Sequence, residues 1–349
     1  MAKAVQASCG RAVAFDERPA ESPAALAAHD ILLASGAEVV TGWHGRLAEE
    51  DYDALVVSPG FARHHPSIRD ALAAGKPVLS EIEFAYRISE APIVGITGTN
   101  GKSTTTVMTW LLAKTVGTAW LAGNIAGSGY EERTLTDAAV LAGSEDLIVA
   151  EISSFQLEWI EQFAPLASAI TNITPDHLDR YTGFDEYRDT KLKIFAAVPP
   201  GGACFTVAGE PSLPQSLVAP HIEAGVRYEA IPPADPSLAP WAGEFDLKNL
   251  AIAWALASSW RPLGETARQA IREFRGLANR MERLGERQGI LVVNNSMCTN
   301  PAAVIASSRS LRRPQVILLG GVTKDLDFSS VGEYLKESGH QAVLFGPLG

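Results

Sequence analysis

The chain has 349 residues, of which 46% are hydrophobic and 20% are charged. This composition supplies enough apolar material for packed cores, excludes a disordered or fibrous protein, and at about 150 residues per domain suggests two or three domains. The 29 basic and 40 acidic residues give a net charge of −11 at pH 7, which argues against a basic surface for nucleic acid.

Residues 1–90 are predicted to form an α/β unit. A strand is expected over residues 12–15, ending at Asp16, and another over residues 54–58, ending in the turn Pro59-Gly60. Between them, the apolar spacing of residues 24–35 predicts a helix. This order of strand, helix and strand is typical of an open α/β sheet. No βα unit is expected before the first strand, because the segment that precedes it is too short.

Residues 91–277 are predicted to form a central domain. Its start is marked by the proline of Ala91-Pro92, and residues 93–97 form a buried strand. Further strands are expected over residues 147–150 and 167–171, and a buried helix over residues 248–260. The proline-rich stretch 198–244 is predicted to form turns and short strands rather than a domain of its own.

Residues 278–349 are predicted to form a third block that again alternates strands and helices. The expected elements, in chain order, are a strand over 290–293, a helix over 301–311, a strand over 315–319, a helix over 331–338 and a strand over 342–345. We therefore expect an α/β protein with a central parallel sheet and two flanking α/β blocks.

The strongest motif is Gly-Ile-Thr-Gly-Thr-Asn-Gly-Lys-Ser-Thr at residues 95–104, between a buried strand and a helix. Gly98 and Gly101 would let backbone N–H groups close around phosphate oxygens, and the helix N-terminus adds a positive dipole end. Lys102 is predicted to bridge the terminal phosphates, and Ser103 or Thr104 to bind Mg²⁺. The alternative is a glycine turn without function, which the flanking strand and helix disfavour.

Three polar residues near the ends of later elements are further candidates. Glu151 ends an apolar run, where a metal ion would be a natural partner, although a solvent-facing carboxylate is the alternative. His177, with Asp176 and Asp179 beside it, could bind a metal or simply be solvated. Lys191 lies in an amphipathic helix and, by spacing alone, is an ordinary surface lysine.

Together these segments resemble the Mur ligase family. The likeness covers nearly the whole chain, and the ordered set of motifs is more specific than any one of them. The run Ser-Ser-Phe-Gln-Leu at 153–157 and the run beginning Gly-Gly-Val at 320–328 favour the family member that adds D-glutamate. The segments that carry the resemblance are 98–104, 123–125, 151–158, 172–180, 187–191, Asn249, Asn300 and 319–328.

The resemblance implies a central phosphate-loop ATPase domain between two Rossmann-like domains. It implies ATP-dependent amide formation through an acyl phosphate, with two Mg²⁺ sites. The ATP-binding residues would be Gly98, Thr99, Asn100, Gly101, Lys102, Ser103, Thr104, Asn249 and Arg280. The metal sites would draw on Ser103, Thr104, Glu151, His177 and Lys191, with Lys102, Lys191 and His177 as catalytic residues and Lys191 carbamylated.

The resemblance also implies the substrates, UDP-N-acetylmuramoyl-L-alanine and D-glutamate, and the residues that would bind them. Asp16, Arg18 and Gly60 would hold the uridine nucleotide, since a carboxylate at a strand end can accept a hydrogen bond from a base or ribose. Asn124 and Ser153 or Ser154 would line the substrate site, and Thr299 and Lys324 would contact the D-glutamate carboxylates.

Several positions depart from the family pattern. Asn295 stands where the family has Asp, Met297 where it has Lys, Asn279 where it has His, and Phe245-Asp246 where it has His-Asn. The family's first strand and glycine-rich loop have no match before Arg11, and its pattern continues past Phe345. We therefore expect a chain shortened at both ends. Cys298 is interpreted as a small core residue rather than a catalytic thiol.

Two alternatives remain at this point. The departures would also fit a shortened, non-catalytic nucleotide-binding homologue or a gene fragment. A sister ligase that adds glutamate to folates is the other alternative, disfavoured by residues 153–157 and by Asp16-Glu-Arg18.

The remaining expectations concern location and partners. No apolar stretch approaches the roughly 18 residues that span a bilayer, and the N-terminus lacks a secretory signal. Three widely spaced cysteines favour neither a disulfide framework nor a metal cluster. We expect a cytoplasmic monomer without nucleic-acid or membrane partners.

Overall fold

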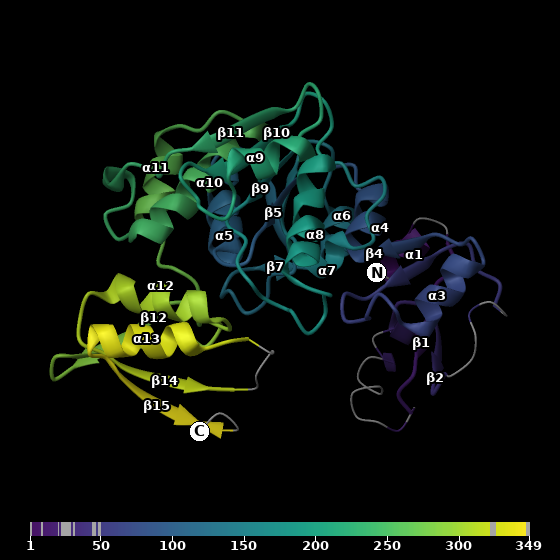
Figure 1. Cartoon of the computed structure of the whole chain (residues 1–349). Coiled ribbons are helices and arrows are strands. Elements are labelled where there is room, and N and C mark those ends of the chain that lie inside the picture. The colour runs from purple at the N-terminus through teal and green to yellow at the C-terminus, as the bar shows by residue number, and fades with distance from the viewer. Residues whose placement is uncertain are drawn as a thin grey trace.

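The computed structural model describes residues 2–7, 10–19, 21, 29–30, 32–43, 47, 50–321 and 326–346. Its centre is a seven-stranded sheet in the order β11-β10-β9-β5-β8-β6-β7, in which every neighbouring pair is parallel. The strands are β5 (Ile93–Thr97), β6 (Ala119–Gly123), β7 (Glu132–Arg133), β8 (Leu147–Glu151), β9 (Ala167–Ile170), β10 (Ala203–Val207) and β11 (Arg227–Ile231). Figure 1 shows this sheet between two smaller flanking parts.

Helices cover both faces of the sheet. On one face lie α5 (Lys102–Ala113), α10 (Glu244–Trp260) and α11 (Glu265–Arg272), and on the other α4 (Glu81–Ile88), α6 (Leu135–Leu141) and α8 (Phe184–Ala196). Alternate side chains of β5 enter opposite cores, with Val94 and Ile96 on the α5 side and Ile93 on the α8 side. A parallel sheet buried on both faces explains why its strands appear in the sequence as continuous apolar runs.

The N-terminal part holds two small parallel pairs. They are β1 (Val13–Asp16) with β2 (Glu38–Thr41), and β3 (Leu55–Val57) with β4 (Val78–Ser80). Among the described residues of this part, α1 (Ala2–Ala7), α3 (Pro66–Ala73) and residues 29–30 and 32–34 are helical.

The C-terminal part also holds two strand pairs. They are an antiparallel hairpin of β12 (Glu282–Arg287) with β13 (Ile290–Asn294), and a parallel pair of β14 (Val316–Gly320) with β15 (Gln341–Phe345). Its helices are α12 (Pro301–Leu311) and α13 (Ser329–Ser338). Short elements elsewhere are α7 (Ser154–Leu157), α9 (Gln215–Val218), and the 3₁₀ turns Ala219–His221 and Pro236–Leu238.

The α/β architecture predicted from the sequence is confirmed. Strand β5 and helix α12 have the predicted bounds, and the other expected elements in the described parts differ by at most a few residues at an end. Half of the expected helix over residues 24–35 lies outside the described residues, and of the described half, residues 29–30 and 32–34 are helical. The two domain boundaries stay a prediction, although α4, before the first boundary, packs against α6 of the central part. Among the described residues, no helix is long and apolar enough to cross a bilayer.

Glu83 of α4 is a buried carboxylate that holds the segment after α7. Its side chain is fully buried, and it accepts hydrogen bonds from the backbone N–H groups of Glu161 (2.8 Å), Gln162 (3.0 Å) and Phe163 (2.9 Å). Arg87 Nε donates to its other oxygen at 2.7 Å. Burial alone would raise the pKa of Glu83, but the hydrogen bonds from this backbone and from Arg87 outweigh burial and lower the pKa.

Replacing Glu83 with alanine is therefore expected to lower the free energy of unfolding by about 3 kcal/mol at neutral pH. The folded-state pKa lies below the ordinary value of about 4.3, so the ionised carboxylate stabilises the fold above that pH. This contribution is lost as the pH falls through the folded-state pKa. Urea denaturation at neutral pH and at steps toward acid should show the gap between wild type and Glu83→Ala closing.

Glu161→Ala is the matched control for this prediction. Glu161 also pairs with Arg87, at 2.8 Å, but its side chain is 70% exposed. Exposed ion pairs contribute at most about 1 kcal/mol. Equal losses in the two variants, or a gap that does not depend on pH, would contradict the role assigned to Glu83.

Candidate active site

The loop between β5 and α5 has the backbone that a phosphate loop requires. Gly98 (φ 145°) and Gly101 (φ 85°) lie in the region of φ that favours glycine. A Cβ on Gly98 would lie 1.9 Å from Thr171 Oγ1, and one on Gly101 would lie 2.5 Å from Asn249 Oδ1. Both glycines are therefore required by close neighbours as well as by conformation. The loop ends at the N-terminus of α5, where free N–H groups favour an anion.

Residues after β9 hold this loop in shape. The backbone N–H of Thr99 donates to Asn172 O (2.9 Å), and that of Asn100 donates to Asn172 Oδ1 (3.0 Å). Asn100 O accepts from Thr171 Oγ1 at 2.6 Å and from Asn172 Nδ2 at 3.0 Å. Thr99 Oγ1 donates to Thr174 O at 3.0 Å. The motif at 98–101 and the motif that begins at 172 therefore form one hydrogen-bonded unit.

Lys102 opens α5 and lies over the loop. Its Nζ donates to Thr99 O at 2.9 Å, and the residue is half-buried. The ammonium group is thus held on the same side as the loop, at the positive end of the helix dipole.

Ser103, in the first turn of α5, and Glu151, at the end of β8, form a buried pair of oxygen-bearing side chains. Ser103 Oγ donates to Glu151 Oε2 at 2.5 Å, and both residues are buried, with 3% and 2% of their surface exposed. Asn124 Nδ2 donates to the other carboxylate oxygen at 3.3 Å, and its backbone N–H donates to Glu151 O at 2.8 Å. Thr104, the next residue of α5, is half-buried. The solvent-facing alternative for Glu151 is therefore wrong.

Lys191 is not a surface lysine, so the interpretation from its spacing is wrong. It lies on the sheet side of α8 and is only 2% exposed. Its Nζ donates to Gly98 O at 2.9 Å and to Thr97 Oγ1 at 3.4 Å. Burial, together with the positive charge of Lys102, holds the pKa of Lys191 well below its ordinary value. The site thus contains a buried amine that favours its neutral form.

His177 lies in the loop after β9, within a group of aromatic rings. Its backbone adopts φ 53°, its ring is 4.8 Å from that of Phe155 and 6.4 Å from that of Tyr187, and its side chain is 32% exposed. Asp176 Oδ2 lies 3.8 Å from its Nε2, and Asp176 is 5% exposed. His177 is therefore held by neighbours and not merely solvated.

Ser153 and Ser154 lie at the start of α7, directly after the strand that ends in Glu151. Ser153 caps this helix, because its Oγ accepts from the Gln156 N–H at 3.3 Å while Gln156 Oε1 accepts from the Ser153 N–H at 2.9 Å. Ser154 is buried, with 2% of its surface exposed.

The C-terminal part meets the phosphate loop through one side chain that the sequence analysis gave no site role of its own. Asn300 Nδ2 donates to Asn100 Oδ1 at 3.0 Å, while Asn300 Oδ1 caps α12 by accepting from the Ala303 N–H at 2.9 Å. Thr299, the preceding residue, is exposed. Arg280 is half-buried, and its backbone N–H donates to Leu277 O at 3.4 Å. Lys324 lies outside the described residues.

The predicted nucleotide-binding residues of the first block lie at strand ends. Asp16 ends β1, and both of its carboxylate oxygens accept from the Arg18 guanidinium. Oδ1 accepts from Nε at 2.9 Å, and Oδ2 accepts from Nη2 at 2.6 Å. The hydrogen bond from Arg18 lowers the pKa of Asp16. Gly60 follows β3, with nothing within 4 Å of the position of a Cβ. These residues all belong to the N-terminal part, where Asp16 O accepts from the Trp43 N–H at 3.1 Å and Arg18 O from the Gly42 N–H at 2.8 Å.

Two of the departures from the family pattern, Asn295 and Asp246, have structural roles here. Asn295 Oδ1 accepts from the Met281 N–H at 3.1 Å, and its Nδ2 donates to Ser307 Oγ at 2.9 Å. Met297 is 42% exposed. Asp246 Oδ2 accepts from the Gly243 N–H at 3.0 Å, which caps α10, and burial raises its pKa.

Cys298, which the sequence analysis interpreted as a core residue, is half-buried in the structure. Burial raises the pKa of its thiol, which disfavours the reactive thiolate.

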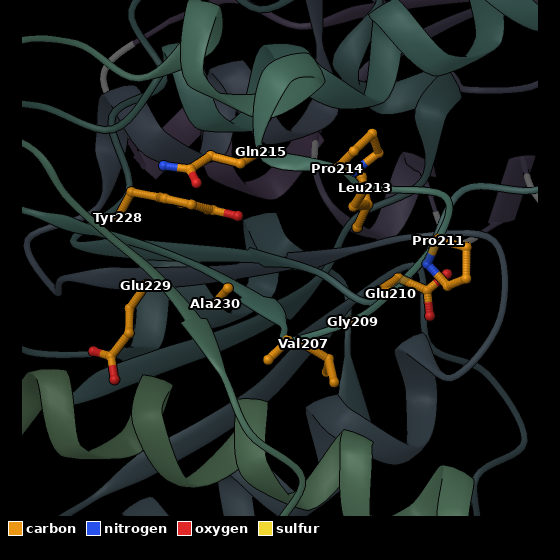
Figure 2. Close-up of a pocket in the computed structure, with 11 residues that line it drawn as sticks. Val207, Gly209, Glu210, Pro211, Leu213, Pro214, Gln215, Tyr228, Glu229 and Ala230 are labelled. Carbon is orange, nitrogen blue, oxygen red and sulfur yellow. The ribbon is translucent and has the colours of Figure 1, made fainter.

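A cavity of about 610 Å³ lies elsewhere, at the ends of β10 and β11. Figure 2 shows Tyr228 and Gln215 on one side of it and Val207 and Ala230 on another. None of the predicted site residues lines this cavity. Among the described residues, no group of three or more His, Cys, Asp or Glu side chains is arranged to hold a metal ion, so a cation would depend on Ser103, Glu151 and oxygens of a bound phosphate.

Known proteins resemble this chain over most of its length. The Mur ligase middle domain model matches residues 96–227. The UDP-N-acetylmuramoylalanine–D-glutamate ligase of Pelotomaculum thermopropionicum is 32% identical over 345 residues, which cover 90% of this chain and 73% of that protein. The ligase of the same name from Enterococcus hirae is 31% identical over 353 residues, which cover 92% and 72%.

Solved structures share the fold. MurF from Acinetobacter baumannii has a TM-score of 0.62 at 14% identity, covering 96% of this chain and 82% of that one. MurF ligase from Thermotoga maritima, solved in complex with ADP, has a TM-score of 0.57 at 14% identity, covering 84% and 85%.

Proposed function

Because the chain belongs to the Mur ligase family, we propose that it joins D-glutamate to UDP-N-acetylmuramoyl-L-alanine at the expense of ATP. The relatives named as UDP-N-acetylmuramoylalanine–D-glutamate ligases support the choice of substrates. The observation that carries the proposal is the phosphate loop of residues 98–104 lying over the buried Ser103–Glu151 pair and beside the buried amine of Lys191.

ATP is proposed to bind with its phosphates on this loop. Backbone N–H groups of residues 98–104, apart from those of Thr99 and Asn100, which donate to Asn172, would hold the phosphate oxygens together with the ammonium group of Lys102. They would offset charge as it moves to the leaving ADP. Asn249, which packs against Gly101, and Arg280 are proposed to contact the rest of the nucleotide.

The donor set fits Mg²⁺ at the loop. Ser103 and Glu151 offer a hydroxyl and a carboxylate oxygen, the hard ligands that Mg²⁺ prefers, and the ion usually completes its shell with phosphate oxygens and water. Thr104 and His177 are proposed as additional ligands, with His177 at a second Mg²⁺ site. Bound Mg²⁺ would neutralise charge on the phosphates.

Lys191 is proposed to carry a carbamate. Addition of CO₂ to the neutral amine forms an N–C bond and releases one proton, which leaves a negatively charged carbamate in place of the neutral amine. The lowered pKa of Lys191 favours the neutral amine that this addition needs. The carboxylate would then lie close to Glu151 and Asp176, whose charges already act on this side chain, and a cation would be needed to balance them.

The acceptor is proposed to extend from the N-terminal part to the loop. Asp16, Arg18 and Gly60 would bind the uridine nucleotide, while Asn124, Ser153 and Ser154 would line the path to the reacting carboxylate. Thr299 and Lys324 would contact the carboxylates of D-glutamate. The Asn300–Asn100 hydrogen bond supports this arrangement, because it brings the segment that carries Thr299 to the phosphate loop.

The proposed reaction has two steps. The acceptor carboxylate attacks the γ-phosphorus of ATP, which forms an acyl phosphate and releases ADP. The amine of D-glutamate then attacks the acyl carbon, loses a proton, and expels inorganic phosphate as the amide forms. We further propose that residues 1–90, 91–277 and 278–349 act as acceptor-binding, ATP-binding and amino-acid-binding domains of a cytoplasmic monomer.

The test is ADP release by the purified protein with substrates omitted in turn. The proposal predicts ADP only when ATP, Mg²⁺, the UDP-linked acceptor and D-glutamate are all present. ADP no higher than background in the complete mixture would contradict it, and ATP binding without turnover would favour a nucleotide-binding homologue, which is the second candidate because Met297 offers no charge or donor. L-glutamate and a folate acceptor are the specificity controls.

A further inference from the structure

Arg180 follows the His177 loop and makes a buried bidentate ion pair with Glu158. Its Nε and Nη2 each donate to one oxygen of Glu158 at 2.8 Å. The Glu158 side chain is fully buried and that of Arg180 is 11% exposed. Breaking such a buried pair from one side leaves an uncompensated charge, so the geometry of the two side chains is strongly constrained.

The same guanidinium reaches across to the N-terminal part. Arg180 Nη2 also donates to Phe61 O at 2.7 Å. Phe61 directly follows Gly60, which is proposed to touch the uridine nucleotide. A second arginine supports this junction from the other side, because Arg63 pairs with Glu186 of α8 at 2.7 Å and lies 5.8 Å from the ring of Trp159.

On its other side Arg180 is connected to His177. The guanidinium lies 4.0 Å from the centre of the Phe155 ring, and the same ring meets His177 edge-on at 4.8 Å. Phe155 belongs to α7, immediately after Ser153 and Ser154. One arginine therefore contacts the segment after Gly60, the segment proposed to line the acceptor path, and the ring against which His177 packs.

We propose that Arg180, held by Glu158, is a positioning residue that sets the acceptor-binding loop at Gly60–Phe61 relative to the phosphate loop. This inference rests on the proposed function. The UDP-linked acceptor must reach from one part to the other, and a fixed distance between the two ends keeps its carboxylate in reach of the γ-phosphate. ATP, whose proposed contacts are the phosphate loop, Asn249 and Arg280, does not depend on this junction.

The test compares Arg180→Lys with Arg188→Lys. Lysine keeps the charge at position 180 but cannot make the two-pronged contact and the third bond to Phe61 O together. We expect the Kd of UDP-N-acetylmuramoyl-L-alanine, measured by calorimetry, to weaken about tenfold, as loss of one or two hydrogen bonds implies. The Kd of a non-hydrolysable ATP analogue should stay within about twofold of the wild-type value. In kinetic assays the KM for the acceptor should rise while the KM for ATP stays near that of the wild type.

Arg188 is the matched control, because it also makes two ion pairs from the same region, with Asp185 and Asp189, whose side chains are 80% and 56% exposed. Arg188→Lys should change neither affinity. If thermal denaturation shows that Arg180→Lys is not folded, Glu158→Gln is tested in its place. Glutamine keeps the shape of glutamate and one acceptor oxygen but removes the charge, so the same selective loss of acceptor affinity is expected.

Equal weakening of both ligands, or no weakening of the acceptor, would overturn the positioning role. A wild-type protein that binds no acceptor would instead contradict the proposed function, and the positioning role with it. A wild type that binds the acceptor, together with an Arg180→Lys variant that binds it equally well, would contradict the positioning role alone.

Discussion

Replacing Lys102 with alanine is expected to lower the rate of ADP formation by about 10³-fold. The ammonium group is held over the phosphate loop by its bond to Thr99 O, and no other lysine of the described chain lies at the start of α5. Without it, the charge that builds on the phosphates during transfer loses a pre-positioned cation. The measurement is a coupled ADP assay at saturating substrates.

The fold should survive this change. Lys102 is half-buried at a helix start, so its truncation is expected to shift the free energy of unfolding by less than about 1 kcal/mol. Lys114→Ala is the control, because Lys114 follows the other end of α5, far in sequence from the phosphate loop, and its ammonium group lies 4.4 Å from the centre of the Trp110 ring. Wild-type turnover in Lys102→Ala would show that residues 98–104 do not bind the transferred phosphate.

Lys191→Ala is expected to lower turnover by at least about 10²-fold, because it removes a proposed carbamate rather than a cation that contacts the phosphates. If Lys191 carries a carbamate, the variant lacks a carboxylate near Glu151 and gains a cavity where the side chain was. Small carboxylates such as acetate or formate should enter this cavity and restore part of the rate. Activity of the wild type should also fall when dissolved CO₂ and bicarbonate are removed.

Two control variants distinguish loss of the carbamate from a general packing defect in Lys191→Ala. Lys193→Ala removes a half-buried lysine from the same helix, two residues away, and should retain activity. Lys191→Met fills the volume without a carboxylate and should be inactive and not rescued. A Lys191→Ala protein that acetate and formate leave unchanged, together with an intact mass that never shows added CO₂, would contradict the carbamate.

Local pattern predicted much of the central part of this fold. An uninterrupted apolar run followed by glycines and a helix is enough to fix β5, the phosphate loop and α5, because each depends on neighbours in sequence. The hairpin strand β12 was not predicted, since Glu-Arg-Leu-Gly-Glu-Arg is mostly polar and exposed, and its pairing with β13 comes from the partner strand.

The structure brings several of the predicted residues together at the phosphate loop, among them Lys102, Ser103 and Glu151, but the sequence did not predict their environment. The spacing on α8, which was interpreted as amphipathic, could not reveal that Lys191 is buried, because the buried face of this helix carries polar residues, Thr190 and Lys191, as well as apolar ones. The Asn300–Asn100 and Arg180–Phe61 hydrogen bonds join segments 200 and 119 residues apart. Such contacts depend on how the three parts of the chain pack, which no local pattern contains.

The most direct test of the proposed chemistry follows an oxygen atom. The acceptor is labelled with ¹⁸O in its alanine carboxylate and incubated with the protein, ATP, Mg²⁺ and D-glutamate, and the inorganic phosphate and the sugar-nucleotide product are analysed by mass spectrometry. Ligation through an acyl phosphate predicts one labelled oxygen in each phosphate released, together with a product heavier by one glutamyl residue. Unlabelled phosphate, or ADP formed without that product, would contradict ligation through an acyl phosphate.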